Sequence, residues 1–248
     1  MRFFKKGRTK DFEFMNFKDQ EKLKAVTFSY DDGATQDIRL IELLNKYGLK
    51  CTFNLNSNLL GKAGLLDRNG KRISHYKIHP SDVKAVYDGH EIAVHTLTHP
   101  LLPSLEESEI IHQVEQDRYN LSELVDYEVV GMAYPGGGIN NDDRVASIIK
   151  EHTGVKYSRT IVSSKNFDVQ NNLFRFNPSV YHLDFVEMME LGQKFIELKT
   201  NEPKILYIWG HSYEMDYEED YWVRLEEFFK LISNKDDIFY STNKEVLL

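Results

Sequence analysis

Two adjacent carboxylates, Asp31 and Asp32, end an apolar run in the stretch VTFSYDDGATQD, which covers residues 26–37. A strand that ends at the protein surface could simply meet water there. Two neighbouring carboxylates can also divide their work, because one can bind a metal ion while the other accepts a proton. The stretch by itself is compatible with both interpretations.

Two histidines four residues apart, His95 and His99, occur in the stretch HTLTHP. The preceding EIAV favours a strand and Pro100 follows directly, which indicates a strand end that curls into one turn. The metalloprotease motif H-E-x-x-H is absent. Two neutral imidazoles and one carboxylate suit a borderline divalent cation such as Zn²⁺. One such histidine alone would more often cap a strand, but the pair together with the two aspartates favours a metal site.

Alternating strands and helices must position these residues. We predict strands over 24–30, 51–56, 90–96, 127–135, 155–162, 204–210 and 238–242, and helices over 35–48, 80–89, 103–125, 141–154, 183–200 and 220–233. Ser104 and Glu107 have capping-box spacing at the start of the longest helix, and a polar loop is expected up to about residue 79. Such alternation gives a largely parallel α/β sheet covered by helices, which right-handed crossovers allow to curl into a barrel.

The ends of the predicted strands carry the polar residues. Parallel α/β folds place their chemistry at the C-terminal ends of the strands. Those ends hold Asp31-Asp32, His95 and His99, YPGGG at 134–138 and WGHSYE at 209–214. Residues able to bind a metal or move a proton are therefore expected along one edge of the sheet.

Bulk properties narrow the class of protein. The 248 residues contain no repeat or linker, so we expect a single domain over 1–248. The net charge of −8 argues against nucleic-acid binding. No apolar run reaches membrane-spanning length, and the start MRFFKKGRTK lacks the apolar segment of a secretory signal. We expect a cytoplasmic protein if this N-terminus is native, and a trimmed exported protein otherwise. The single cysteine, Cys51, is expected to be a small buried hydrophobe.

Four stretches together resemble a known family. TFSYDDG, HTLTH, YPGGG and YIWGHS, in this order, are similar to the motifs of the polysaccharide deacetylases, the NodB-homology domain of carbohydrate esterase family 4. The resemblance covers residues from about 24 to 212. It implies a distorted (β/α) barrel, usually of seven strands, and a divalent metal held by one aspartate and two histidines.

The resemblance also implies roles for individual residues. Asp31 matches the general base, Asp32, His95 and His99 match the metal ligands, and His211 matches the general acid. A metal-bound water would attack the carbonyl of an N-acetyl or O-acetyl group on an oligosaccharide or polysaccharide. The metal is expected to be Zn²⁺, with Co²⁺, Ni²⁺ or Mn²⁺ as alternatives.

The stretches YPGGG and YIWGHS suggest contacts to the substrate. The backbone N–H of Gly136 is the candidate donor to the oxyanion, and Tyr134 is a candidate contact beside it. Tyr207 and Trp209, which precede His211, could shape an acetyl-sized pocket. Ordinary packing within a strand explains the two aromatic residues equally well.

One residue of the family pattern is missing. The third motif normally contains an arginine that orients the base, and Ala133 occupies that position here. Arg159, near the end of the next predicted strand, could deliver a guanidinium to Asp31 instead. Otherwise the base is unpaired and the site is slow or inert.

The resemblance implies a carboxylate that pairs with His211, and this carboxylate is not evident in the sequence. Asp168 is the first candidate and Asp184 the second, while His182 could line the same mouth. Glu214 could simply start the following helix.

Three functions are compatible with these residues. The first is a metal-dependent carbohydrate deacetylase. The second is an amidohydrolase of a small non-sugar substrate with a C–N bond, similar to allantoinases. The third is a carbohydrate-binding pseudoenzyme, which the missing arginine favours, although such a protein would need neither Asp31 nor His211.

Overall fold

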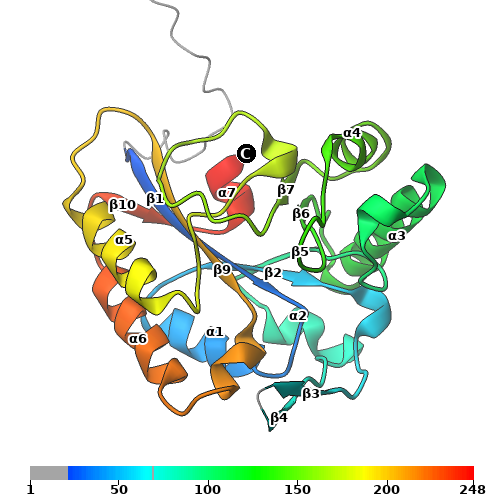
Figure 1. Ribbon diagram of the computed structural model, residues 1–248, viewed down its shortest axis with the longest axis horizontal. Coiled ribbons are helices and arrows are strands. Elements are labelled where there is room, and N and C mark those ends of the chain that lie inside the picture. Colours follow the sequence, from blue (N-terminus) through cyan, green and yellow to red (C-terminus); the bar gives the residue numbers. More distant parts are fainter. Residues whose placement is uncertain (1–21, 69) are drawn as a thin grey trace, which may run out of the picture.

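Strand β1 (Lys24–Asp31) lies at the centre of a curled parallel sheet in the computed structural model, which describes residues 22–68 and 70–248 (Figure 1). The N-terminal stretch on which the prediction about cellular location rests lies outside the described residues. From one edge to the other, the strands are β7 (Tyr157–Arg159), β6 (Gly131–Ala133), β5 (Glu91–Val94), β2 (Cys51–Leu55), β1, β9 (Lys204–Gly210) and β8 (Val180–Tyr181).

An eighth strand, β10 (Ile238–Tyr240), pairs with the beginning of β1, while β2 pairs with its end. Every pairing between strands of this sheet is parallel. The seven other strands form one continuous path, and its two edges, β7 and β8, do not pair with each other in the described part of the chain. The predicted α/β barrel of the distorted type is confirmed, in the form of an open, curled half-barrel, with eight strands in the described part of the chain where the resemblance implied seven.

Two sets of helices cover the outer face of this curl (Figure 1). Helices α1 (Asp37–Lys46), α6 (Tyr221–Ile232) and α5 (Phe185–Glu197) pack side by side, as do α2 (Val83–Val86), α3 (Glu107–Val125) and α4 (Asp143–His152). Helical spacing gives each longer helix one apolar stripe; in α6 it consists of Trp222, Leu225, Phe228, Phe229 and Ile232. Among the described residues, no helix is long and apolar enough to cross a membrane.

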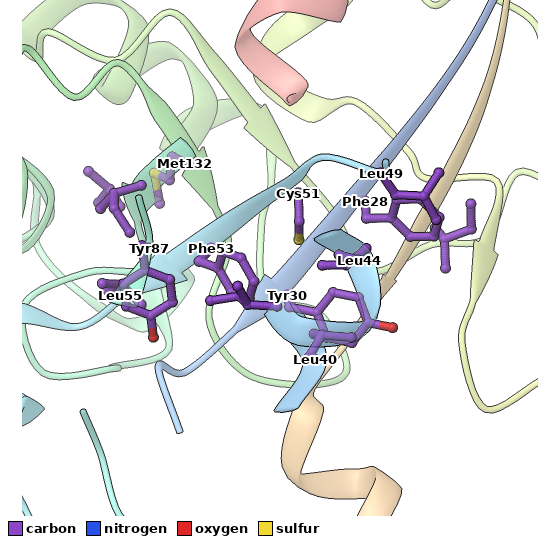
Figure 2. Packing of buried hydrophobic residues seen from close by; sticks show 14 of the residues in the cluster. Phe28, Tyr30, Leu40, Leu44, Leu49, Cys51, Phe53, Leu55, Tyr87 and Met132 are labelled. Carbon is purple, nitrogen blue, oxygen red and sulfur yellow. The ribbon is translucent and has the colours of Figure 1, made fainter. Parts of the chain in front are cut away.

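The main core lies between the sheet and these helices. Figure 2 shows Phe28 and Tyr30 of β1 close to Leu40 and Leu44 of α1, with Cys51 of β2 in the same cluster. Burial raises the pKa of the Cys51 thiol well above its usual value. Cys51 is therefore a small buried hydrophobe, as the sequence predicts.

Alternate residues of β1 face the interior of the curl instead. Helix α7 (Asn243–Leu247) closes the interior at the end where the parallel strands begin. The Asn243 amide donates to the Thr27 hydroxyl at 2.8 Å, and Asn243 accepts from the Tyr207 hydroxyl at 2.7 Å. The opposite end, where β1 finishes at Asp31, is the one that remains for a functional site.

Two local predictions are wrong. The segment predicted as a loop contains an antiparallel hairpin of β3 (Leu65–Arg68) and β4 (Lys71–Ser74), whose mostly exposed residues leave no apolar alternation to detect. Helix α3 begins only at Glu107, because a 3₁₀ turn precedes it. Within that turn the Ser104 hydroxyl donates to the Leu101 carbonyl at 2.7 Å and does not cap α3.

Candidate functional site

Three potential metal ligands, Asp32, His95 and His99, meet at the ends of β1 and β5. Oδ1 of Asp32 lies 3.8 Å from Nε2 of His95 and 3.6 Å from Nε2 of His99. All three ligand atoms lie within 4.8 Å of one another. In a tetrahedral zinc site with ligand bonds near 2.1 Å, neighbouring ligand atoms are about 3.4 Å apart. The spacing and the donor types therefore fit a single divalent ion.

The protonation of His95 also fits a ligand. Its Nδ1 lies 2.9 Å from the carbonyl oxygen of Ala133. Because a carbonyl oxygen can only accept, Nδ1 carries the proton and Nε2 keeps its lone pair toward Asp32. Burial lowers the pKa of His95 to about 4, so the imidazole is neutral near pH 7.

The backbone turns sharply where these ligands lie. Asp32, Thr96 and His99 all have positive φ angles, of 82°, 67° and 63°. Such angles cost non-glycine residues on the order of 1–3 kcal/mol each and need support from the surroundings. Asn56 supplies part of it, since its side-chain amide donates to the carbonyls of His95 and Thr96. These turns bring Asp32 and His99 back over the strand ends.

Asp31, the predicted base, is buried beside this cluster and bound by Arg159. Nη2 of Arg159 lies 2.5 Å from both carboxylate oxygens of Asp31. The Asn54 amide donates to the same carboxylate at 2.8 Å. Arg159 is itself held, because its Nε donates to the Ser29 hydroxyl at 3.0 Å and its guanidinium stacks on the Trp209 ring at 4.7 Å.

The strand register explains how Arg159 reaches Asp31. Ala133 of β6 pairs directly with Arg159 of β7, so the guanidinium enters from the neighbouring strand at the same level. Burial alone would raise the pKa of Asp31, but the charge and hydrogen bond of Arg159, with His95 and His211 nearby, lower it. Asp31 is thus held as a carboxylate. A part for Arg159 in catalysis stays a prediction.

His211, the predicted acid, faces Asp31 and is bound by Glu214. Nε2 of His211 lies 4.0 Å from Oδ2 of Asp31, and its Nδ1 lies 2.9 Å from Oε2 of Glu214. Burial alone would lower the pKa of His211. The charge and hydrogen bond of Glu214, together with Asp32 and Asp31, outweigh burial and raise it to about 9. Near neutral pH the imidazole is therefore protonated.

The predictions that Asp168 or Asp184 pairs with His211 are wrong. Asp168 binds the ammonium of Lys204 at 2.6 Å, where β9 begins, and so lies at the opposite end of the strand from His211. Asp184 is the residue that precedes α5. The carboxylate in contact with His211 is that of Glu214.

A spacing in the sequence could have revealed Glu214. Residues 212–216 form a 3₁₀ helix, in which side chains three positions apart lie on the same side, and Glu214 follows His211 by three. His182, expected at the mouth, is wholly buried behind Glu214.

A cavity of about 260 Å³ opens between these groups; it is lined by Asp31, Asp32, His95, His99, Tyr134, Gly136, Gly137, Ile161, Trp209, His211 and Tyr213. Gly136, Tyr134 and Trp209, three of the four predicted substrate contacts, therefore border it. Gly136 has a φ of 81° and, within the described chain, its N–H makes no hydrogen bond, so this group is free to donate to a ligand. The Asn140 side chain holds the Gly136 carbonyl at 2.9 Å.

Tyr134 and Tyr207 do not offer the substrate contacts that were expected of them. The N–H of Tyr134 donates to the Arg159 carbonyl at 3.0 Å, and its hydroxyl donates to the Phe174 carbonyl at 2.7 Å. Tyr134 therefore has no donor left for a substrate and contributes only a wall. Tyr207 does not line the cavity, since its hydroxyl binds Asn243 near the closed end.

Two further groups reach Asp32 from the segment that follows the hairpin. Nε2 of His75 lies 3.3 Å from Oδ2 of Asp32, and Nζ of Lys77 lies 3.8 Å from Oδ1. Burial alone would raise the pKa of Asp32, but these neighbours, with His211 and His95, lower it well below its usual value. No periodic signal marks this segment, so the sequence did not indicate either residue.

Asp117 on α3 supports the site from outside. Its carboxylate accepts from the backbone N–H of Ser57 at 2.7 Å and from that of His95 at 3.1 Å. The helix is thereby tied to the chain that follows β2 and to the residue that follows β5. The sequence did carry a signal for this role, because Asp117 is an acidic residue at a position of the predicted helix where the spacing calls for an apolar one.

Comparison with protein families gives one match. Residues 18–156 match the family described as polysaccharide deacetylase, which is more than half of the chain. Comparison with curated proteins found no match.

Solved structures with similar folds are distant in sequence. A probable polysaccharide deacetylase from Pseudomonas aeruginosa has a TM-score of 0.68 at 12% identity, covering 93% of this chain and 92% of that one. Puue allantoinase has a TM-score of 0.64 at 11% identity, covering 89% and 87%. For the Streptococcus pyogenes deacetylase PplD in complex with acetate the values are 0.50 and 19%, and the match covers 60% of this chain and 61% of that one, less than two thirds of its length. These similarities establish the fold.

Proposed function

Because this chain belongs to the polysaccharide deacetylase family, we propose that it hydrolyses acetyl groups on an N-acetylated or O-acetylated carbohydrate. One observation carries the proposal. A carboxylate held ionised, Asp31, and a histidine held protonated, His211, face the same cavity beside a cluster that fits a divalent metal. This arrangement supplies a base and an acid at once, as hydrolysis of an amide or ester requires.

Asp32, His95 and His99 would hold the metal, for which zinc is our first choice. When bound, a divalent ion lowers the pKa of water and polarises an acyl oxygen. Asp31 accepts the proton of the attacking water, and Arg159 keeps it ionised and in place. The free N–H of Gly136 donates to the oxygen on which negative charge develops. His211 donates its Nε2 proton to the departing amine or alcohol.

The size of the cavity bears on the substrate. About 260 Å³ is less than the 300–1,000 Å³ typical of sites that enclose a whole ligand. It would take the acetyl group and the sugar atoms next to it, while the rest of an oligosaccharide stays outside. Ile161, Trp209 and Tyr213 provide the apolar and aromatic wall for the methyl group.

The small cavity also favours a second candidate, an amidohydrolase of a small non-sugar substrate with a C–N bond. The fold shared with Puue allantoinase is compatible with this candidate. A binding-only pseudoenzyme is less well supported, because its main argument was a missing arginine and Arg159 contacts the base.

Metal analysis combined with acetate release tests the proposal. Purified protein would be assayed on chitooligosaccharides, acetylated xylan and peptidoglycan fragments, with allantoin as the small-substrate arm. We expect bound metal, acetate release from one of the acetylated carbohydrates and a loss of 10²–10⁴-fold in Asp31→Asn. Bound metal without acetate release, or an Asp31→Asn protein as active as the wild type, would overturn it.

A further inference from the structure

Glu214 lies at the centre of a buried polar cluster that extends beyond His211. Its Oε2 is 2.9 Å from His211 Nδ1 and 2.8 Å from His182 Nε2, while the backbone N–H of His211 approaches the same oxygen at 3.3 Å. The Tyr181 hydroxyl donates to Oε1, and Arg68 lies 3.5 Å from it. Burial alone would raise the pKa of Glu214, but His211 and His182 lower it well below its usual value.

The proton positions on His182 follow from its partners. Because an ionised carboxylate only accepts, Nε2 of His182 carries a proton and donates it to Glu214 at 2.8 Å. The backbone N–H of His211, 3.4 Å from this nitrogen and 3.3 Å from Glu214 Oε2, therefore donates to the carboxylate. Burial lowers the pKa of His182, so the imidazole is neutral and its Nδ1 is an acceptor. The Tyr30 hydroxyl lies 3.1 Å from that Nδ1 and donates to it. Burial raises the pKa of Tyr30 well above its usual value, which keeps this donor protonated.

The fold makes room for this ring. His182 is wholly buried at the end of β8, next to the last residue of β9, Gly210. A Cβ atom on Gly210 would overlap the imidazole of His182. The ring also meets Tyr30 of β1 edge to face, with 5.2 Å between centroids. Three strands therefore fix the position from which His182 donates.

We propose that His182 is a positioning residue: its Nε2–H holds Oε2 of Glu214 on Nδ1 of His211, which aims the other nitrogen of His211 into the cavity. Two donors compete for the carboxylate on its other oxygen, Tyr181 and the half-exposed Arg68. Without the His182 donor, the carboxylate can turn toward them and leave His211 without its partner. The inference rests on the proposed function only in that His211 is taken as the acid.

Several charged or polar groups face His211 and set its protonation. They are Glu214 on its own 3₁₀ helix, Asp31 and Asp32 at the end of β1, His182 behind Glu214, and the rings of Trp209 and Tyr213. Glu214 is the first of the groups that raise the pKa of His211. If the carboxylate turns away, that pKa falls, so His211 loses its proton at a lower pH.

Two variants of similar size separate hydrogen bonding from packing. The amide of His182→Gln can still donate to Glu214, whereas His182→Leu fills the site without a donor. NMR titration of the full chain with isotope-labelled histidine, with the His211 signal assigned from a His211→Gln variant, gives the pKa of His211 directly. We expect a fall of about one unit or more in His182→Leu, and a value near that of the wild type in His182→Gln.

In kinetics, His182→Leu is expected to lower kcat about tenfold with KM within twofold, and to move the alkaline limb of the pH profile to lower pH. An unchanged His211 titration in folded His182→Leu protein would overturn the proposal. So would equal falls in both variants, because shape and not the donor would then matter. If His182→Leu does not fold, His182→Asn, whose shorter amide cannot reach Glu214, takes its place with the same expectation.

The titration needs no substrate. Failure of the wild type to release acetate would therefore count against the proposed function and leave the inference about His182 standing.

Discussion

Arg159 shows how a single residue can restore what a neighbouring position lacks. The position that the family resemblance reserves for an arginine holds Ala133, on β6. Arg159, its direct partner in β7, makes the contact to Asp31 from the next strand. The guanidinium that the resemblance places on β6 is therefore supplied by β7 in this chain, at the position directly opposite Ala133.

Replacing Arg159 by alanine should affect both stability and the base. An unpaired buried carboxylate costs about 3–5 kcal/mol of unfolding free energy. The pKa of Asp31, which Arg159 lowers, should rise. Since only ionised Asp31 can accept a proton, the acid limb of the pH–rate profile should move to higher pH and kcat/KM should fall. Urea unfolding and the pH dependence of acetate release measure these effects.

A second-site change provides the control. Ala133→Arg introduced together with Arg159→Ala puts the guanidinium on the strand where the family keeps it, and we expect it to regain part of the lost activity. An Arg159→Ala enzyme with an unchanged rate and pH profile would show that the guanidinium does not serve the base.

At the level of elements, the site depends on how strands and helices are tied to one another. Strands β1 and β5 bring Asp32, His95 and His99 together, although β2 lies between these two strands in the sheet. Asp117 connects α3 to the residues that follow β2 and β5. Burial raises the pKa of the Asp117 carboxyl to about 7, which means that burying its charged form costs free energy. The two backbone hydrogen bonds that it accepts offset part of that cost and give it a structural role.

Asp117→Ala should loosen the end of β5 and weaken metal binding. The N–H of Ser57 loses its acceptor, at a cost of about 1–3 kcal/mol, while that of His95 keeps the Leu55 carbonyl at 2.9 Å. We expect zinc affinity to fall about 10–100-fold, as for other groups that orient a ligand. Competition with a chromophoric chelator measures the affinity, and urea unfolding measures the stability.

Asp117→Asn is the matched comparison, because its amide oxygen can still accept one N–H. Its zinc affinity should lie between those of the wild type and Asp117→Ala. Affinities equal to the wild type in both variants would mean that α3 does not position His95.

The whole molecule is a curl with one closed and one open end. Helix α7 fills the end where the strands begin, with Val246 and Leu247 in an apolar cluster that also contains Tyr157 and Tyr207. The interior toward the other end carries polar and charged side chains, among them Asp31 and Arg159. Asp31 and Arg159 are tolerated there because they pair with each other, and their position makes that end suitable for chemistry.

Metal binding should stabilise the whole fold. At a free zinc concentration 100 times Kd, the gain is about 2.7 kcal/mol. For a chain of this size that corresponds to a rise in Tm of roughly 5–11 °C, which EDTA should reverse. Differential scanning calorimetry with and without zinc measures the shift.

His99→Asn is the control for this experiment. His99 is the most exposed of the three ligands, and asparagine tolerates its positive φ, so the metal-free protein should change little. The zinc-dependent shift should largely disappear in this variant. An undiminished shift would place the stabilising metal elsewhere.

The sequence by itself determined the chain of elements and the residue types at their ends. Apolar β-branched runs and helical spacing depend on neighbours in sequence, so the α/β alternation could be predicted, and so could Asp31, Asp32, His95 and His99 at the strand ends. The hairpin β3–β4 could not, because its exposed residues carry no periodic pattern.

Only the tertiary structure decided which side chains meet. Arg159 reaches Asp31 across 128 positions because β7 pairs with β6 in one particular register. His182 reaches Glu214 because β8 lies beside β9 and Gly210 leaves space for the ring. Such contacts depend on strand order and register, which local sequence patterns do not encode. The residue types of the candidate catalytic groups can thus be predicted from the sequence, whereas the partners that set their protonation follow from the pairing of the strands.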